Sequence, residues 1–123
     1  MKEHGGGKII NVASLDAFRP EVNVGIYSIS KAGVVMATKV MAVEWAQYNI
    51  RVNAIAPGNT DTRLGDSRFV LHPELEGDMI KRTPLGYIAQ PEEMVGAMTY
   101  LASDASSFVT GETIVADRGQ LLT

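Results

Sequence analysis

The sequence predicts an α/β fold in which three parallel strands alternate with crossover helices, in the order strand, helix, strand, helices, strand. Three short apolar runs rich in β-branched residues have the length of buried strands, at residues 8–13, 50–57 and 111–117. Helical patterns fill both intervals between these runs. Because the runs lack strict polar alternation, we expect helices to cover both faces of the sheet.

The first strand, residues 8–13, precedes a long proline-free stretch that predicts a helix over residues 23–47. This helix is apolar around most of its circumference, which indicates burial on more than one face. One face would cover the sheet and another would contact a second subunit. An apolar strand at the edge of a thin sheet also invites pairing. We therefore expect a homo-oligomer formed through helix 23–47 and the exposed strand 8–13.

The second strand, residues 50–57, ends at Pro57-Gly58, and a polar loop follows over residues 59–63. Short helices are expected over residues 65–82, with Pro73 interrupting any longer one. A firmer helix begins at Pro91, where proline suits the first turn and the following acidic residues favour the positive helix N-terminus. The strand at residues 111–117 completes the sheet.

Composition narrows the range of functions. The 123 residues have the size of one small domain, residues 1–123, and 46% hydrophobic with 20% charged residues indicates a folded chain. A net charge of -3 without a Lys/Arg cluster argues against nucleic acid or an anionic membrane as partner. The chain has no cysteine, and its two histidines lack metal-ligand spacing, so no metal site is expected.

The expected cellular compartment follows from the apolar segments and from the cysteine content. We expect no apolar run long enough to span a bilayer, and the N-terminus lacks the apolar core of a signal peptide. The absence of cysteine suits a reducing compartment. The predicted location is the cytoplasm.

Three side chains near the first strand form a candidate proton-transfer site. Tyr27 and Lys31 are four residues apart, on one face of the predicted helix. A nearby ammonium favours a phenolate, which makes Tyr27 a candidate general acid or base. Ser14 follows the first strand, and parallel sheets bind ligands at the carboxyl ends of their strands. By themselves, Tyr-x-x-x-Lys arises readily by chance and Ser14 fits a turn cap equally well.

The wider sequence resembles the short-chain dehydrogenase/reductase family. The matching segments occur in family order and spacing: GGGKIINVAS, YSISKAG, IRVNAIAPGNTDT, PEE and YLASDASSFVTGETIVADRG. They cover nearly the whole chain but only the C-terminal half of the family's fold. The resemblance therefore implies a partial, Rossmann-like doubly wound fold and NAD(P)-dependent interconversion of an alcohol and a ketone.

The same resemblance implies roles for individual residues. Tyr27 would exchange the proton with the substrate oxygen, Lys31 would assist it and bind the nicotinamide ribose, and Ser14 would polarise the substrate oxygen. Four further residues would contact the cofactor, although the two threonines fit loop capping equally well: Pro57, Gly58, Thr60 and Thr62. Two positions depart from the family pattern, Tyr87 where arginine is common and Arg118 within a usual Asp-Gly-Gly.

The family's Gly-rich phosphate turn has no counterpart here, since the glycines at positions 5–7 precede a strand. We expect a truncated or partial chain that binds NAD or NADP weakly or not at all by itself. The residue that selects between NAD and NADP belongs to the missing half, so both stay open. Two hypotheses remain: the catalytic half of an oxidoreductase, or a truncated, catalytically inactive, self-associating half-fold. An unrelated α/β binding domain would require the whole motif series to be coincidence.

Overall fold

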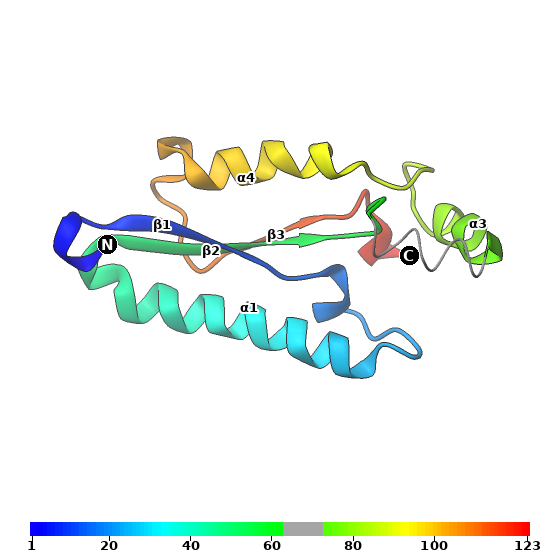
Figure 1. The fold of residues 1–123 in the computed structure, drawn as a ribbon, viewed down its shortest axis with the longest axis horizontal. Helices are drawn as coiled ribbons and strands as arrows, with labels where there is room; N and C mark the ends of the chain where they lie inside the picture. The colour runs from blue at the N-terminus through cyan, green and yellow to red at the C-terminus, as the bar shows by residue number, and fades with distance from the viewer. Residues whose placement is uncertain (63–72) are drawn as a thin grey trace.

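A three-stranded parallel sheet organises the chain in the computed structural model, which describes residues 1–62 and 73–123 (Figure 1). Its strands are β1 (Gly7–Val12), β2 (Ile50–Pro57) and β3 (Thr113–Ala116), in the order β1-β2-β3. The predicted α/β class and parallel arrangement are confirmed. The bounds of β2 are as predicted, whereas β1 begins and ends one residue earlier and β3 is shorter.

The strand register brings the carboxyl ends of the three strands to the same end of the sheet. Val12 lies opposite Ile55 in the β1–β2 pair, and Pro57 lies opposite Ala116 in the β2–β3 pair. All strands run in the same direction, so the segments that leave their carboxyl ends meet there. This is the edge at which open parallel sheets bind ligands.

Helices cover both faces of the sheet, as predicted. The long helix α1 (Gly25–Trp45) lies on one face, and α4 (Val95–Ala102) lies on the other after a 3-10 turn at Pro91–Met94 (Figure 1). A short helix, α3 (Pro73–Lys81), lies near the carboxyl ends of the strands. Helix α3 is short and begins at Pro73, a position where the fixed φ and missing N–H of proline are tolerated. The part of the expected helical stretch at residues 63–72 lies outside the described residues.

The core centres on β2, which is paired on both sides and covered on both faces. Val52, Ala54, Ile55 and Ala56 are at most 1% exposed. Helix α1 packs on this strand through Val35 and Ala42, and the buried Thr38 between them accepts a hydrogen bond from Asn11 of β1. From the other side, α4 contributes the fully buried Leu101.

Within this core Asn53 is 1% exposed, donates to Val109 O and accepts from Glu112 N. Both partners lie just before β3. Asn53 therefore joins β2 to the segment that leads into β3 and has a structural role.

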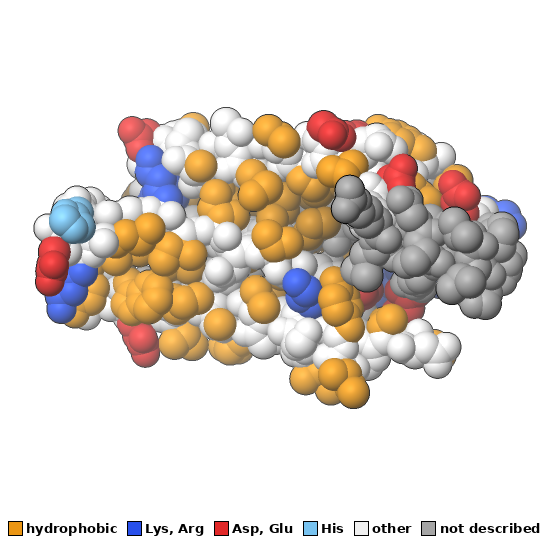
Figure 2. Space-filling model, in the orientation of Figure 1, with side chains coloured by type: hydrophobic (Ala, Val, Ile, Leu, Met, Phe, Trp, Pro, Cys, Tyr) orange, Lys and Arg blue, Asp and Glu red, His pale blue; other side chains and the backbone are white. Residues whose placement is uncertain are grey.

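The outer face of α1 is apolar and exposed. Ile26, Ile29 and Val43 are 88%, 74% and 81% exposed, so within this chain only one face of the helix is buried. Figure 2 shows apolar side chains spread over the visible surface and not confined to the interior. Residues 25–48 also reach the length and hydropathy of a membrane span, 24 residues with a mean hydropathy of 1.3. The expectation that no run is long enough is therefore wrong, although core helices of soluble proteins share these properties.

Candidate active site

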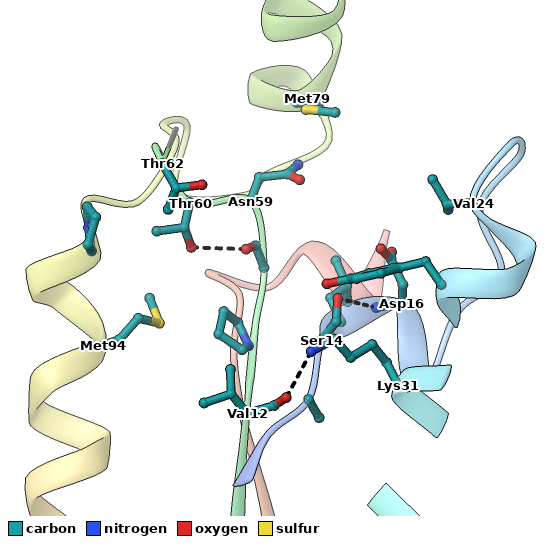
Figure 3. A pocket seen from close by; sticks show the side chains of 16 residues that line it. Val12, Ser14, Asp16, Val24, Lys31, Asn59, Thr60, Thr62, Met79 and Met94 are labelled. Atoms are coloured by element: carbon teal, nitrogen blue, oxygen red, sulfur yellow. Dashed lines mark hydrogen bonds between the residues drawn. The ribbon is translucent and has the colours of Figure 1, made fainter. Parts of the chain in front are cut away.

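A cavity of about 560 Å³ opens at the carboxyl ends of the strands (Figure 3). Its walls come from the ends of β1 and β2, the first two turns of α1, α3, and the 3-10 turn that precedes α4. All of the site residues predicted from the sequence line this one cavity: Ser14, Tyr27, Lys31, Pro57, Gly58, Thr60 and Thr62. The fold thus gathers residues up to 48 positions apart around a single space.

Ser14 lies two residues beyond β1 in extended conformation and is 8% exposed. Its Oγ accepts a hydrogen bond of 3.1 Å from Asp16 N and thereby caps the 3-10 turn Leu15–Ala17. The capping alternative is therefore correct as a local description. It is compatible with chemistry, because a hydroxyl that accepts from the backbone keeps its own proton for a ligand in the cavity.

Tyr27 and Lys31 lie on consecutive turns near the start of α1. The Tyr27 side chain is 40% exposed, and Lys31 Nζ lies 5.6 Å from the centroid of its ring. Lys31 Nζ also donates a 3.0 Å hydrogen bond to Val12 O at the end of β1. The last strand carbonyl therefore holds the ammonium beside the phenol, which is the arrangement that the four-residue spacing predicts.

The opposite wall is formed by residues 58–62, the loop after β2, which we call the loop wall. At Gly58 an added Cβ would lie 2.8 Å from both Cα and Cβ of Asp117, so only glycine lets the two segments approach this closely. Thr60 Oγ1 donates to Gly58 O at 3.1 Å, visible in Figure 3. Thr60 thus stabilises the turn with its own side chain while lining the cavity.

Backbone hydrogen bonds fix the loop wall to distant parts of the chain. Thr60 forms an isolated parallel bridge with Ala89, in which Ala89 N donates to Asn59 O at 3.1 Å and Asp61 N donates to Ala89 O at 2.7 Å. Asn59 N donates to Oε1 of the buried Gln120 at 3.3 Å. The loop is therefore anchored from two sides by residues 30 and 61 positions further along the sequence than Asn59.

A charged cluster supports this anchor in turn. Glu93 accepts from Gln90 N at 2.8 Å, from Tyr87 OH at 3.1 Å and from the Arg118 guanidinium. These bonds, first of all the one from Gln90 N, hold the pKa of Glu93 below its usual value. Arg118 also donates to Tyr87 O and lies over the Tyr87 ring. The two family departures noted in the sequence, Tyr87 and Arg118, thus contact each other directly and share one glutamate.

Several cavity residues were not singled out from the sequence. The clearest is Asn59, predicted only as part of a polar loop; the others are mainly apolar, Val12, Val24, Met79 and Met94. Asn59 directly follows Pro57-Gly58 at the end of a strand, and that position was the available signal. Among residues 1–62 and 73–123, no group of three or more His, Cys, Asp or Glu side chains could hold a metal ion.

The fold and this cavity place the chain in a class. It belongs to the short-chain dehydrogenase/reductase family of oxidoreductases: a family model described as enoyl-(acyl carrier protein) reductase matches residues 1–120. It is 42% identical over 94% of its length to 3β-hydroxysteroid dehydrogenase 1 of Eggerthella lenta, covering 44% of that protein. It is likewise 42% identical over 94% of its length to an NAD-dependent glycerol dehydrogenase of Listeria innocua, again covering 44%.

Solved structures agree with this placement. A gluconate 5-dehydrogenase from Burkholderia cenocepacia, in complex with NADP and tartrate, superposes with a TM-score of 0.94 at 37% identity. That match covers 99% of this chain and 48% of the other. The chain therefore spans about half the length of the relatives that it matches, and their fold over that half is its fold.

Proposed function

We propose that this chain is the catalytic half of an NAD(P)-dependent oxidoreductase that interconverts a secondary alcohol and a ketone. The observation that supports this proposal is the single cavity shared by Ser14, Tyr27, Lys31 and the loop wall at the carboxyl ends of the strands. The substrate is a small molecule, and the enzyme acts in the cytoplasm.

In this proposal the three side chains divide the proton chemistry. The Ser14 hydroxyl donates a hydrogen bond to the substrate oxygen and holds it at the cavity floor. Tyr27 gives its phenolic proton to that oxygen in reduction and takes it back in oxidation. The Lys31 ammonium, held at Val12 O near the ring, stabilises the negative charge left on the tyrosine oxygen.

The cavity residues fit the nicotinamide end of a dinucleotide. Gly58 lines the cavity without a side chain, and Thr60, Thr62 and Lys31 contribute hydroxyl and ammonium groups to the same lining. When bound, the nicotinamide supplies or accepts the hydride. The described residues contain no Gly-rich turn between a strand and a helix, which is what holds the pyrophosphate in such folds. Relatives use NAD or NADP, and both remain open for this chain.

The alternative, a catalytically inactive self-associating half-fold, is supported by exposed surface. Strand β1 is an edge of the sheet, and the outer face of α1 exposes Ile26, Ile29 and Val43. A second copy that packs on α1 and pairs with β1 would cover both surfaces. Light scattering across a concentration series tests this homo-oligomer, and a chain that stays monomeric at high concentration would refute it.

Removal of the Tyr27 hydroxyl group tests the catalytic proposal. Tyr27→Phe removes the proton donor and should reduce turnover at least 100-fold, since general acid-base catalysis contributes roughly 10²–10⁴-fold. Turnover is followed by nicotinamide absorbance in an assembly that binds NAD or NADP. Tyr48→Phe, which alters a tyrosine in the cluster around Ile50 at the other end of the sheet, is the control and should keep normal turnover. Normal turnover by Tyr27→Phe would refute the assigned role.

A further inference from the structure

In the loop wall, both backbone polar groups of Asn59 form hydrogen bonds, but its side-chain nitrogen does not. Its N–H donates to Gln120 Oε1 at 3.3 Å, and its carbonyl accepts from Ala89 N at 3.1 Å. The side-chain Nδ2, in contrast, is shielded from solvent and has no hydrogen-bond partner in the described part of the chain. The backbone hydrogen bonds therefore fix the position of the residue, while the side-chain amide has no acceptor in the described chain.

An unpaired buried donor is unfavourable and rare in native proteins, and it calls for a reason. Asn59 lines the cavity, and Figure 3 shows its amide in the space between Met79 and Ser14. The last torsion of asparagine is soft, and none of the described residues restrains this side chain by a hydrogen bond, so the amide turns toward the cavity at small cost. A ligand with an acceptor atom in the cavity would give Asn59 Nδ2 the hydrogen-bond partner that it lacks in the described chain.

We propose that the Asn59 amide donates a hydrogen bond to a second oxygen of the substrate, beyond the oxygen that reacts. This inference rests on the proposed function, because Ser14 and Tyr27 are taken to hold the reacting oxygen. The neighbouring cavity residues Val24, Met79 and Met94 are apolar and offer that second oxygen no hydrogen bond. The substrate class is therefore an alcohol or ketone with a further hydroxyl or carboxylate, such as a polyol, a hydroxy ketone or a hydroxy acid.

Matched ligands test this preference without turnover. Cyclohexanol is compared with 1,2-, 1,3- and 1,4-cyclohexanediol, which place a second hydroxyl at increasing distance from the first. Binding to the ¹⁵N-labelled chain is followed by NMR, with the Asn59 side-chain amide as reporter. At least one diol should bind roughly 3- to 10-fold more tightly than cyclohexanol, the value of one good hydrogen bond, and should shift the Asn59 amide resonances.

Asn59→Leu, of similar size but apolar, should abolish the preference for the diol. It should also leave the thermal midpoint unchanged or raise it, because it removes an unsatisfied donor from a buried position. A purely structural asparagine would instead lose stability on this change. Thr113→Val is the matched control: Thr113 Oγ1 is also buried and unpaired in the described chain but lies on β3 outside the cavity lining. This variant should keep the diol preference.

The outcomes separate this proposal from the proposed function. If no diol binds better than cyclohexanol, if none of these ligands binds, or if Asn59→Leu keeps the preference, Asn59 does not select the substrate. A shift of the Asn59 amide by nicotinamide mononucleotide together with no diol preference would also overturn the proposal, because the amide would then serve the cofactor. Loss of the Tyr27 role in turnover would leave the diol preference intact and would refute the proposed function alone.

Discussion

The two walls of the cavity are built in different ways. The strand–helix wall, Ser14, Tyr27 and Lys31, is local: its members lie within 18 residues, and its contacts join β1 to the start of α1. The loop wall, residues 58–62, is fixed by backbone pairing with Ala89, by Gln120 and, through Gln90, by Glu93 and Arg118. Two of the three reactive side chains, Tyr27 and Lys31, thus lie on the exposed start of α1, whereas the opposite wall is held by many contacts with later segments.

This difference predicts unequal tolerance to substitution. The first turns of α1 are largely exposed on their outer side, so changes there should alter chemistry and leave folding intact. The loop wall is enclosed by segments from later in the chain, so changes there should alter folding and the shape of the cavity together. The following predictions test this contrast, from the largest expected effect to the smallest.

Adding one methyl group to each region gives the strongest contrast in stability. Gly58→Ala places a Cβ 2.8 Å from Asp117 Cα, so backbone must move, at a cost of roughly 1–3 kcal/mol. Gly33→Ala, on the exposed face of α1 with no atom within 4 Å of the new methyl, should instead stabilise by about 0.5–1 kcal/mol. Urea unfolding of both variants measures the difference. Equal stability of the two would mean that the loop wall is no tighter than the helix.

Arg118→Gly tests whether the charged cluster stabilises the loop wall. The change removes the hydrogen bonds to Glu93 and to Tyr87 O from a guanidinium that is only 10% exposed. It also relieves a positive φ of 58°, a gain of at most about 1 kcal/mol. We expect the loss to dominate, with a lower thermal midpoint and faster hydrogen exchange at Ala89 and Asp61.

Asn23→Gly is the control for the backbone part of that effect. Asn23 has a φ of 69° and lies in the exposed loop before α1, so glycine there isolates the conformational relief. This variant should leave Ala89 and Asp61 protected. Similar deprotection in both variants would show that the Arg118 side chain does not support the loop wall.

Acid should weaken the same cluster through Glu93. Its pKa is lowered in the folded chain, first by the hydrogen bond from Gln90 N, so its contribution to stability is present above the ordinary value of 4.5. That contribution is lost as the pH falls through the lower folded-state pKa. The stability difference between the wild type and Glu93→Gln should therefore be full near neutral pH and shrink below about pH 4.5. Glu92→Gln, which changes an exposed neighbour, is the matched control. A pH-independent Glu93→Gln difference would contradict the assignment.

The contrast between the walls also explains what the sequence could predict. Strand β2 and helix α1 follow from apolar runs and periodicity within one segment. Ser14, Tyr27 and Lys31 follow from a motif at short spacing, and the four predicted cofactor residues follow from the resemblance to the family. The short helix α3 follows from the proline at its start, because proline ends a preceding helix and is a good first residue of the next one. The Thr60–Ala89 bridge and the Glu93–Arg118 contact join residues 29 and 25 positions apart. No local pattern specifies such pairs, so the support of the loop wall emerges only in the fold.

The smallest effect is expected far from both walls, where Lys8 near the start of β1 contacts Asp104 after α4. Lys8 Nζ donates a 2.6 Å hydrogen bond to Asp104 Oδ1, and this bond is the main reason that the pKa of Asp104 is lowered. The aspartate side chain is 94% exposed, so solvent and salt screen the pair and it should add little to stability. Lys8→Ala should therefore raise the Asp104 pKa toward its ordinary value in an NMR titration and leave the thermal midpoint almost unchanged. Lys39→Ala, which removes an exposed lysine of α1, should alter neither. A large drop in the midpoint for Lys8→Ala would show that the β1 edge depends on this pair, and the loop wall would then no longer be the most sensitive region.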